Sequence, residues 1–300
     1  MSAVGLGCNN FGRRLDVAGT RAVVDAAIDA GITLLDTADV YGGGDSERFL
    51  GEVLEGRRDR VVLATKFGLD AGDANGPPAG PRGARAYIRQ AVDASLRRLR
   101  TDRIDLYQYH RPDGVTPIEE TLAALHELVQ EGRARAIGCS NFTAAQIEEA
   151  DRVARERGLT RFTSAQNEYS LLRRDVEAEI TPVCRRLELG IIPYFPLASG
   201  LLTGKYRRGQ PAPSGTRLAE LEQVGSDADF DRVEALERFA AARGRSLLDV
   251  AIGGLAAQPM VASVIAGATR PEQAAGNAAA GEWRPTADDL AELDRIAPPR

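Results

Sequence analysis

The sequence predicts an α/β fold in which parallel strands alternate with helices. Short β-branched or aliphatic runs alternate with amphipathic, charge-rich stretches along the 300 residues. This alternation implies parallel pairing, because a helical crossover returns the chain to the same end of the sheet. Eight such units in about 250 to 300 residues match the size of a (β/α)₈, or TIM, barrel. We therefore expect residues 1–300 to form a single barrel domain.

The eight expected strands are short and spread over the whole chain. In order they are SAVGLGC (2–8), GITLLDT (31–37), RVVLATK (60–66), RIDLYQYH (103–110), ARAIGCSN (134–141), FTSAQNE (162–168), GIIPYFP (190–196) and VASVIAG (261–267). A doubly wound sheet is the alternative fold. Its typical Gly-x-Gly-x-x-Gly turn after the first strand is absent, because the glycines of GLGCNNFG have a different spacing.

Helical periodicity is found between the strands. In residues 87–100 apolar side chains recur at intervals of three and four residues and form one stripe. Similar patterns predict helices over 118–131, 144–157, 175–188 and 229–257. The last of these is expected to be two helices broken near Gly244. An extra C-terminal helix should start near Thr286, a good N-cap followed by two aspartates.

Two long connections exceed what a minimal barrel needs. Residues 70–83 form a Gly/Pro-rich loop after the third strand, and residues 206–227 form a polar connection after the seventh. Both should lie on the face of the barrel where the strands end. Loops of this length in a compact domain are more often functional than idle.

Composition excludes several classes of function. The net charge of −5 provides no electrostatic footprint for nucleic acid or an anionic membrane surface. The chain opens without a charged-then-apolar signal segment, so we expect a cytoplasmic protein. The most apolar stretch, residues 250–268, is interrupted by a Gln-Pro pair and is too broken to span a bilayer. Three cysteines lie far apart without metal-ligand spacing, so no metal site is expected.

Unusual polar residues lie where consecutive strands end. Asp36 ends the second strand and Tyr41 follows it, Lys66 ends the third, and His110 ends the fourth. Each alone has an ordinary explanation, such as a helix cap or a structural histidine. The carboxyl ends of barrel strands surround one mouth, where active sites of this fold are found. A carboxylate, a phenol, an ammonium and an imidazole around one mouth favour a catalytic site.

This set suits proton transfer to a carbonyl oxygen while hydride reaches the carbonyl carbon. Tyr41 would be the acid, and the neighbouring Lys66 ammonium would lower the pKa of its phenol. Asp36 would be the counter-ion of Lys66. His110 would orient the carbonyl oxygen or share the proton. Proton transfer by a positioned side chain is worth roughly 10²- to 10⁴-fold in rate.

A hydride donor implies a dinucleotide site, and two segments are suited to phosphate. Residues 199–209 offer flexible backbone amides together with Lys205. In residues 267–273, Gly267 follows the eighth strand and Pro271 is expected at the first position of a helix, whose N-terminus binds anions. Arg270 beside it could clamp an additional phosphate, which favours NADPH over NADH as the cofactor.

Other polar strand ends could bind the nicotinamide. Tyr194, at the end of the seventh strand, could stack on the ring. Three residues at the ends of the fifth and sixth strands could hydrogen-bond its carboxamide, namely Ser140, Asn141 and Gln166.

These segments resemble a known family along nearly the whole chain. DTADVYGGGDSERFLG, ATKFG, DLYQYHRPD, GCSNF, AQNEYSLL, PLASGLLTGKY and GATRPEQ are similar, in this order, to motifs of the aldo-keto reductases. That family consists of NAD(P)H-dependent enzymes with a (β/α)₈ barrel. The resemblance implies that Tyr41 is the general acid and that Asp36, Lys66 and His110 complete a tetrad.

The resemblance also implies a division of the cofactor site. It assigns the nicotinamide to Ser140, Asn141, Gln166 and Tyr194. It assigns the pyrophosphate to Leu197, Gly200, Leu201 and Lys205. It assigns the adenosine 2′-phosphate end to Thr269, Arg270, Gln273 and Asn277.

The sequence departs from the family pattern at three places. Members usually begin with about twenty more residues that form a hairpin plugging the lower mouth, so this N-terminal plug is expected to be missing. Gly276 stands where many relatives have an acidic residue, and Phe195 stands where serine is common. None of these departures affects the tetrad.

Three functions remain open from the sequence. The leading hypothesis is NADPH-dependent reduction of a small aldehyde or ketone, with NADH less favoured. The second is a cofactor-binding accessory or redox-sensing subunit resembling potassium-channel beta subunits. The third is a lyase that forms a Schiff base on Lys66.

Overall fold

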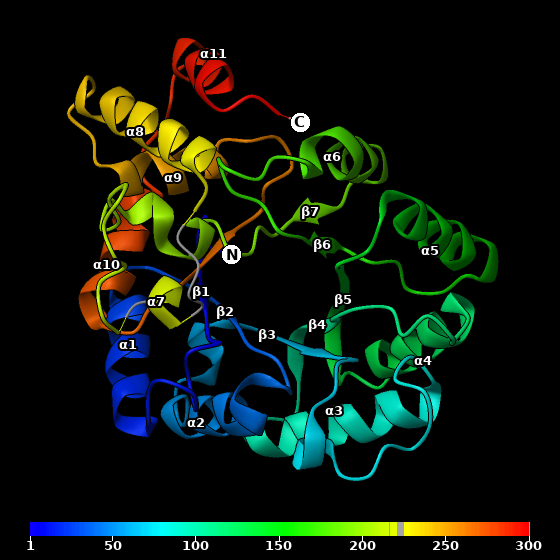
Figure 1. The fold of residues 1–300 in the computed structure, drawn as a ribbon. Helices are drawn as coiled ribbons and strands as arrows, with labels where there is room; N and C mark the ends of the chain where they lie inside the picture. The colour runs from blue at the N-terminus through cyan, green and yellow to red at the C-terminus, as the bar shows by residue number, and fades with distance from the viewer. Residues whose placement is uncertain (216, 221–224, 300) are drawn as a thin grey trace.

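Eight parallel strands form one curled sheet in the computed structural model, which describes residues 1–215, 217–220 and 225–299 (Figure 1). The strands are β1 (Val4–Gly7), β2 (Leu34–Asp36), β3 (Val62–Phe67), β4 (Ile104–Tyr109), β5 (Ala134–Ser140), β6 (Ser164–Gln166), β7 (Gly190–Ile191) and β8 (Val264–Gly267). They are ordered β7-β6-β5-β4-β3-β2-β1-β8, and every neighbouring pair is parallel. The predicted (β/α)₈ fold class is confirmed, and each expected run contains one strand.

Backbone hydrogen bonds also join the two ends of this strand order. Ile191 N donates to Met260 O over 2.7 Å, and Ala262 N donates to Ile191 O over 2.8 Å. Beyond β7, Ile265 N in β8 donates to Pro193 O over 3.1 Å. These bonds close the sheet into a barrel although β7 itself is only two residues long.

Helices surround the strands (Figure 1). They are α1 (Val17–Asp29), α2 (Asp45–Val53), α3 (Arg85–Leu99), α4 (Ile118–Gln130), α5 (Ala144–Arg157), α6 (Val176–Leu187), α7 (Arg217–Glu220), α8 (Asp227–Ala241), α9 (Leu247–Ala256), α10 (Pro271–Ala280) and α11 (Ala287–Ile296). Short 3₁₀ segments are η1 (Tyr41–Gly44), η2 (Arg58–Arg60), η3 (Gly72–Asn75) and η4 (Ala198–Thr203). The described helices are all too short or too polar to cross a membrane.

Local signals explain where the C-terminal helices begin and end. α8 and α9 are separate, and Gly244 lies between them with a φ of 61°, so the expected break is confirmed. Thr286 is the N-cap of α11, because its side chain accepts a hydrogen bond from Asp289 N. Both features follow from glycine's access to positive φ and from the cap preference of threonine.

The expected long connections are partly structured. Residues 70–83 contain η3, and the connection 206–227 contains α7 but also residues 216 and 221–224, which lie outside the described part. At the N-terminus, residues 1–3 lead directly into β1.

Candidate active site

The alternation of side chains along β2, β3 and β4 builds the centre of the site. Successive side chains of a strand point to opposite faces. Leu34, Ala64 and Leu106 belong to a small apolar cluster separate from the main core. Two residues further along each strand lie Asp36, Lys66 and Gln108, which therefore point to the same side, into the barrel. The apolar cluster thus forms one layer of the barrel interior, and the polar side chains form the next layer toward the ends of the strands.

Lys66 connects the predicted tetrad residues. Its Nζ donates to Asp36 Oδ2 over 2.5 Å and to the backbone oxygen of Thr37 over 3.0 Å. The same ammonium lies 3.5 Å from Tyr41 Oη. Lys66 has no solvent exposure and Asp36 is 2% exposed, so the ion pair is buried. A buried charge needs such a partner. The phenol of Tyr41 lies next to the ammonium of this pair.

Gln108 is a member of this network that the sequence analysis missed. Asp36 Oδ1 accepts hydrogen bonds of 3.0 Å from both Gln108 Nε2 and Gln166 Nε2. Gln166 Nε2 also donates to Gln108 Oε1 over 3.1 Å. The amide of Gln166, predicted to hold the nicotinamide, is therefore bound to Asp36. Gln108 could have been found from its two-residue spacing to His110 on the same strand.

His110 completes the tetrad from the opposite side. Its ring lies edge to face with that of Tyr41, with the centroids 6.0 Å apart. Burial, with the nearby charges of Lys66 and Arg111, lowers the pKa of His110 to about 3. The imidazole is therefore neutral at physiological pH. Its Nδ1 is buried and has no hydrogen-bond partner in the part of the chain that the structure describes.

Burial controls the protonation of Tyr41 more strongly than Lys66 does. Removal from bulk water raises the pKa of the phenol above its usual value, and Lys66 offsets this only in part. The expectation of a lowered pKa for Tyr41 is therefore wrong, because the burial effect is larger than the ammonium's. Burial would lower the pKa of Lys66, but Asp36 and Tyr41 outweigh it and raise it above the usual value. The site thus holds a protonated phenol next to a protonated amine.

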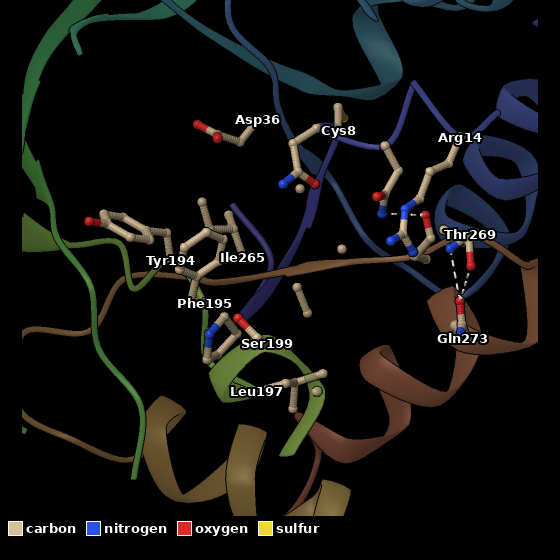
Figure 2. A pocket seen from close by; sticks show the side chains of 18 of the residues that line it. Cys8, Arg14, Asp36, Tyr194, Phe195, Leu197, Ser199, Ile265, Thr269 and Gln273 are labelled. Carbon is tan, nitrogen blue, oxygen red and sulfur yellow. Dashed lines mark hydrogen bonds between the residues drawn. The ribbon is translucent and has the colours of Figure 1, made fainter. Parts of the chain in front are cut away.

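A cavity of about 990 Å³ opens above these residues (Figure 2). Asp36, Tyr41 and His110 line it, whereas Lys66 lies beneath its surface. Figure 2 shows Asp36 and Tyr194 toward one end, and Thr269 and Gln273 toward the other. The cavity is therefore elongated between the end of β2 and the start of α10.

Three of the four residues predicted for the nicotinamide form one hydrogen-bonded group beside His110. Tyr194 Oη donates to Asn141 Oδ1 over 2.8 Å. Asn141 Nδ2 donates to the backbone oxygen of His110 over 2.9 Å and to Ser140 Oγ over 3.1 Å. Asn141 has a φ of 59°, which few residues other than glycine adopt. All three line the cavity, as does Gln166.

The segment predicted for the pyrophosphate follows a tight path along the cavity. Leu197, Gly200 and Lys205 line it, whereas Leu201 is 6% exposed and packs in the hydrophobic core. Gly200 has a φ of 103°, and a Cβ there would lie 3.2 Å from Lys205 Cε. Glycine is therefore needed where this backbone passes the lysine.

The other phosphate segment lies at the far end. Gly267, Thr269, Arg270, Gln273 and Asn277 all line the cavity. Pro271 is the first residue of α10, as predicted, and Gln273 Oε1 accepts from Thr269 N over 2.8 Å. Arg270 is exposed, and no ion pair is formed by its side chain with other described residues. An unpaired guanidinium at a helix N-terminus is suited to an anion.

Two arginines that line the cavity, Arg13 and Arg14, were not predicted, whereas the loops that contain Asn10 and Arg111 were expected to wall the pocket. Asn10, Arg13 and Arg14, in the loop after β1, line the cavity, and Arg14 lies toward Thr269 and Gln273 in Figure 2. Arg111 lines it next to His110. The sequence offers no periodic signal for Arg13 and Arg14, because their position depends on how the loop after β1 packs over β8. Asn10 Nδ2 donates to Ala268 O over 3.2 Å and holds that loop there.

No metal centre is apparent in the described residues. None of their His, Cys, Asp and Glu side chains gather in groups of three or more that could hold a metal ion.

The chain is similar to known proteins over almost its whole length. The family model described as "Aldo/keto reductase family" matches residues 3–298. A protein of Oryza sativa subsp. japonica, described as "Probable voltage-gated potassium channel subunit beta", is 36% identical over 276 residues, 89% of this chain and 83% of the relative. A protein of Arabidopsis thaliana with the same description is 34% identical over 296 residues, 95% of this chain and 88% of the relative.

Proposed function

The chain belongs to the aldo/keto reductase family, and from this premise we propose that it is an NADPH-dependent oxidoreductase that reduces a small aldehyde or ketone to the alcohol. One observation carries the proposal. A protonated phenol, Tyr41, faces the cavity beside the buried Lys66–Asp36 pair and opposite the neutral His110. These groups can hold a carbonyl oxygen and protonate it.

The cavity volume of about 990 Å³ and the hydrogen-bond donors along it support a dinucleotide as the cofactor. Ser140, Asn141 and Tyr194 would hold the nicotinamide next to Tyr41. Gly200 and Lys205 would hold the pyrophosphate, and Thr269, Arg270, Gln273 and Asn277 the adenosine end with its 2′-phosphate. When bound, NADPH supplies the hydride that reaches the carbonyl carbon.

The protein's own residues supply the proton and its control. His110, neutral and lining the cavity beside Tyr41, orients the carbonyl oxygen. Tyr41 Oη donates its proton to that oxygen as the C–O double bond becomes single. Lys66 stabilises the phenolate that remains, and Asp36 fixes Lys66 in place. A proton from solvent then restores the phenol.

A second candidate is supported by the relatives. Both relatives described above carry the description "Probable voltage-gated potassium channel subunit beta". A protein with this role would bind NADPH as a sensing or accessory subunit, and turnover of carbonyl compounds would be absent or incidental.

The Schiff-base hypothesis fits the site poorly. A lysine nucleophile must lose its proton and reach the substrate. Lys66 has no exposed surface, its pKa is raised by Asp36 and Tyr41 against the effect of burial, and it does not line the cavity.

Turnover of the wild-type protein beside a Tyr41→Phe variant tests the proposal. We expect purified protein to oxidise NADPH in the presence of a reactive aryl aldehyde, and the variant to lose roughly 10²- to 10⁴-fold in kcat with its NADPH affinity retained. Tyr169→Phe is the matched control. It removes a phenolic oxygen that lies outside the cavity and donates to Glu177, away from the tetrad. Tight NADPH binding without turnover across a carbonyl panel would instead support the accessory role.

A further inference from the structure

A buried polar cluster lies on the outer side of the barrel strands, behind Tyr41. Its members are Asp39, Glu47, Thr65, Asn75 and Arg98, here called the Arg98 cluster. Asp39, Glu47 and Thr65 have no exposed surface and Asn75 is 6% exposed. Because Thr65 precedes Lys66 on β3, its side chain points away from the barrel interior, toward α2 and α3. The cluster is therefore separate from the cavity.

Arg98 joins three segments in this cluster. From α3, its Nε donates to Glu47 Oε2 in α2 over 2.8 Å. Its Nη2 donates to Asn75 Oδ1 in η3 over 3.0 Å, and its Nη1 donates to the backbone oxygen of Ala74. On the strand side, Thr65 Oγ1 donates to Glu47 Oε1 over 2.5 Å. One guanidinium thus holds α2 and the loop after β3 against the barrel.

Asp39 connects the cluster to the segment that carries the phenol. Asn75 Nδ2 donates to Asp39 Oδ2 over 2.7 Å, and Asp39 N donates to the backbone oxygen of Lys66 over 3.1 Å. Tyr41 follows two residues later, and after it come three glycines that all have positive φ. This glycine run has no side chains with which to hold the phenol in place. Asp39, two residues before Tyr41, anchors this segment through its side chain.

The Arg98 cluster contains two carboxyl groups, Asp39 and Glu47, but only one positively charged side chain, Arg98. Arg98 pairs directly with Glu47 and acts on Asp39 only through space, and Asp39 Oδ1 has no hydrogen-bond partner in the described residues. The other groups that face Asp39 are the amide of Asn75 and the phenols of Tyr87 on α3 and Tyr107 on β4. An unpaired buried carboxylate is costly, so its proton is held more tightly.

We propose that Asp39, held by Asn75, which Arg98 holds in turn, is a positioning residue that fixes Tyr41 against Lys66. The proposal rests on the role of Tyr41 as proton donor. It adds a residue that touches neither substrate nor cofactor and that acts through the backbone of η1. Burial and the charge of Glu47 raise the pKa of Asp39 to about 7. Gain or loss of this proton near neutral pH therefore changes the charge of Asp39 itself.

Variants at Asp39 separate positioning from general stability. Asp39→Ala removes the acceptor of Asn75, and we expect kcat to fall at least about tenfold while KM for the aldehyde changes less than about twofold. Asp39→Asn keeps the shape and an acceptor, so it should recover most of kcat and abolish any change of kcat centred near pH 7. Asp73→Asn, an exposed aspartate in η3, is the matched control and should behave as wild type.

A spectroscopic readout makes the test independent of turnover. In protein labelled with ¹³C at Cζ of its seven tyrosines, the Tyr41 signal, assigned with Tyr41→Phe, should shift with a midpoint near pH 7 in wild type and not in Asp39→Asn. If turnover is absent but this shift is present, the proposed function fails and the positioning role stands. An active protein whose Tyr41 signal and kcat profile are the same in Asp39→Asn as in wild type would overturn the positioning role.

Discussion

Tyr41 combines two properties that act in opposite directions. Burial keeps the phenol protonated, and the ammonium 3.5 Å away stabilises the phenolate once the proton has left. A proton donor needs both, because it must carry a proton at neutral pH and must release it in the transition state. The sequence indicated the ammonium but could not show how deeply the phenol lies.

His110 should remain neutral over the working pH range. Its pKa is lowered to about 3 in the folded protein, first by burial and then by Lys66 and Arg111. Its ring NMR signals should therefore show no titration between about pH 5 and pH 9, and His126→Gln would assign the two histidines. A midpoint near the ordinary value of about 6.5 would contradict this.

The same histidine makes stability depend on pH in a defined direction. Between about pH 3 and about pH 6.5 the unfolded chain binds this proton and the folded chain does not. The contribution of His110 therefore favours folding less and less as the pH falls through this window. His110→Gln should remove that part of the dependence.

Arg270 should control the choice of cofactor. Its exposed guanidinium at the start of α10 has no ion-pair partner in the described residues, and NADPH has a 2′-phosphate that NADH lacks. We expect Arg270→Ala to weaken NADPH binding roughly 10- to 100-fold and to leave NADH binding nearly unchanged. Fluorescence titration with both cofactors measures this, and Arg295→Ala on α11 is the control. Equal losses for both cofactors would contradict the assignment.

The side chains that meet at the strand ends were predictable, because side chains along a strand alternate between its two faces. Asp36 ends β2, Lys66 is the last residue but one of β3, and His110 directly follows β4, and closing the barrel brings them together. Gln108 follows the same rule and could have been included. The partners of Asp39 could not be predicted, because Glu47, Asn75 and Arg98 meet only when α2, η3 and α3 pack together.

The bounds of helices α1 and α2 were not predicted from the sequence, although the alternation implied a helix after each of the first two strands. α2 is nine residues long and begins after Gly44, which offers no side-chain cap. α1 does have a cap, since Asp16 accepts from Gly19 N. Packing against the barrel supplies most of the stability of short helices, and a sequence pattern shows little of it.

Alanine substitutions at two adjacent glycines of η1, Gly42 and Gly43, should differ sharply in their effects on stability and activity. Gly42 and Gly43 have φ values of 60° and 64°, so alanine at either costs about 1–2 kcal/mol in backbone strain. A Cβ at Gly42 would also lie 2.9 Å from Phe11 O, whereas one at Gly43 meets nothing within 4 Å. Gly42→Ala should therefore lose more stability in denaturant unfolding, and more kcat, than Gly43→Ala. Equal effects would show that the contact with Phe11 does not position η1.

At the scale of the whole molecule, the barrel gathers residues from both ends of the chain into one cavity. Asn10 and Asn277 line it together with Tyr41, His110 and Tyr194. The order of the strands was predictable from alternation, but the closure between β7 and β8 depends on three backbone hydrogen bonds between distant segments. The loop after β1 also lines the cavity only because distant segments pack together. For this reason Arg13 and Arg14 in that loop were not predicted.

The fate of the hydride tests the proposed function most directly. The protein is incubated with an aryl aldehyde and NADPH carrying two deuterium atoms at C4 of the nicotinamide, and the alcohol is analysed by mass spectrometry and NMR. We expect one deuterium on the carbinol carbon of each alcohol formed, and almost no alcohol with Tyr41→Phe. Alcohol without deuterium at that carbon, or equal product from Tyr41→Phe, would contradict hydride transfer assisted by Tyr41.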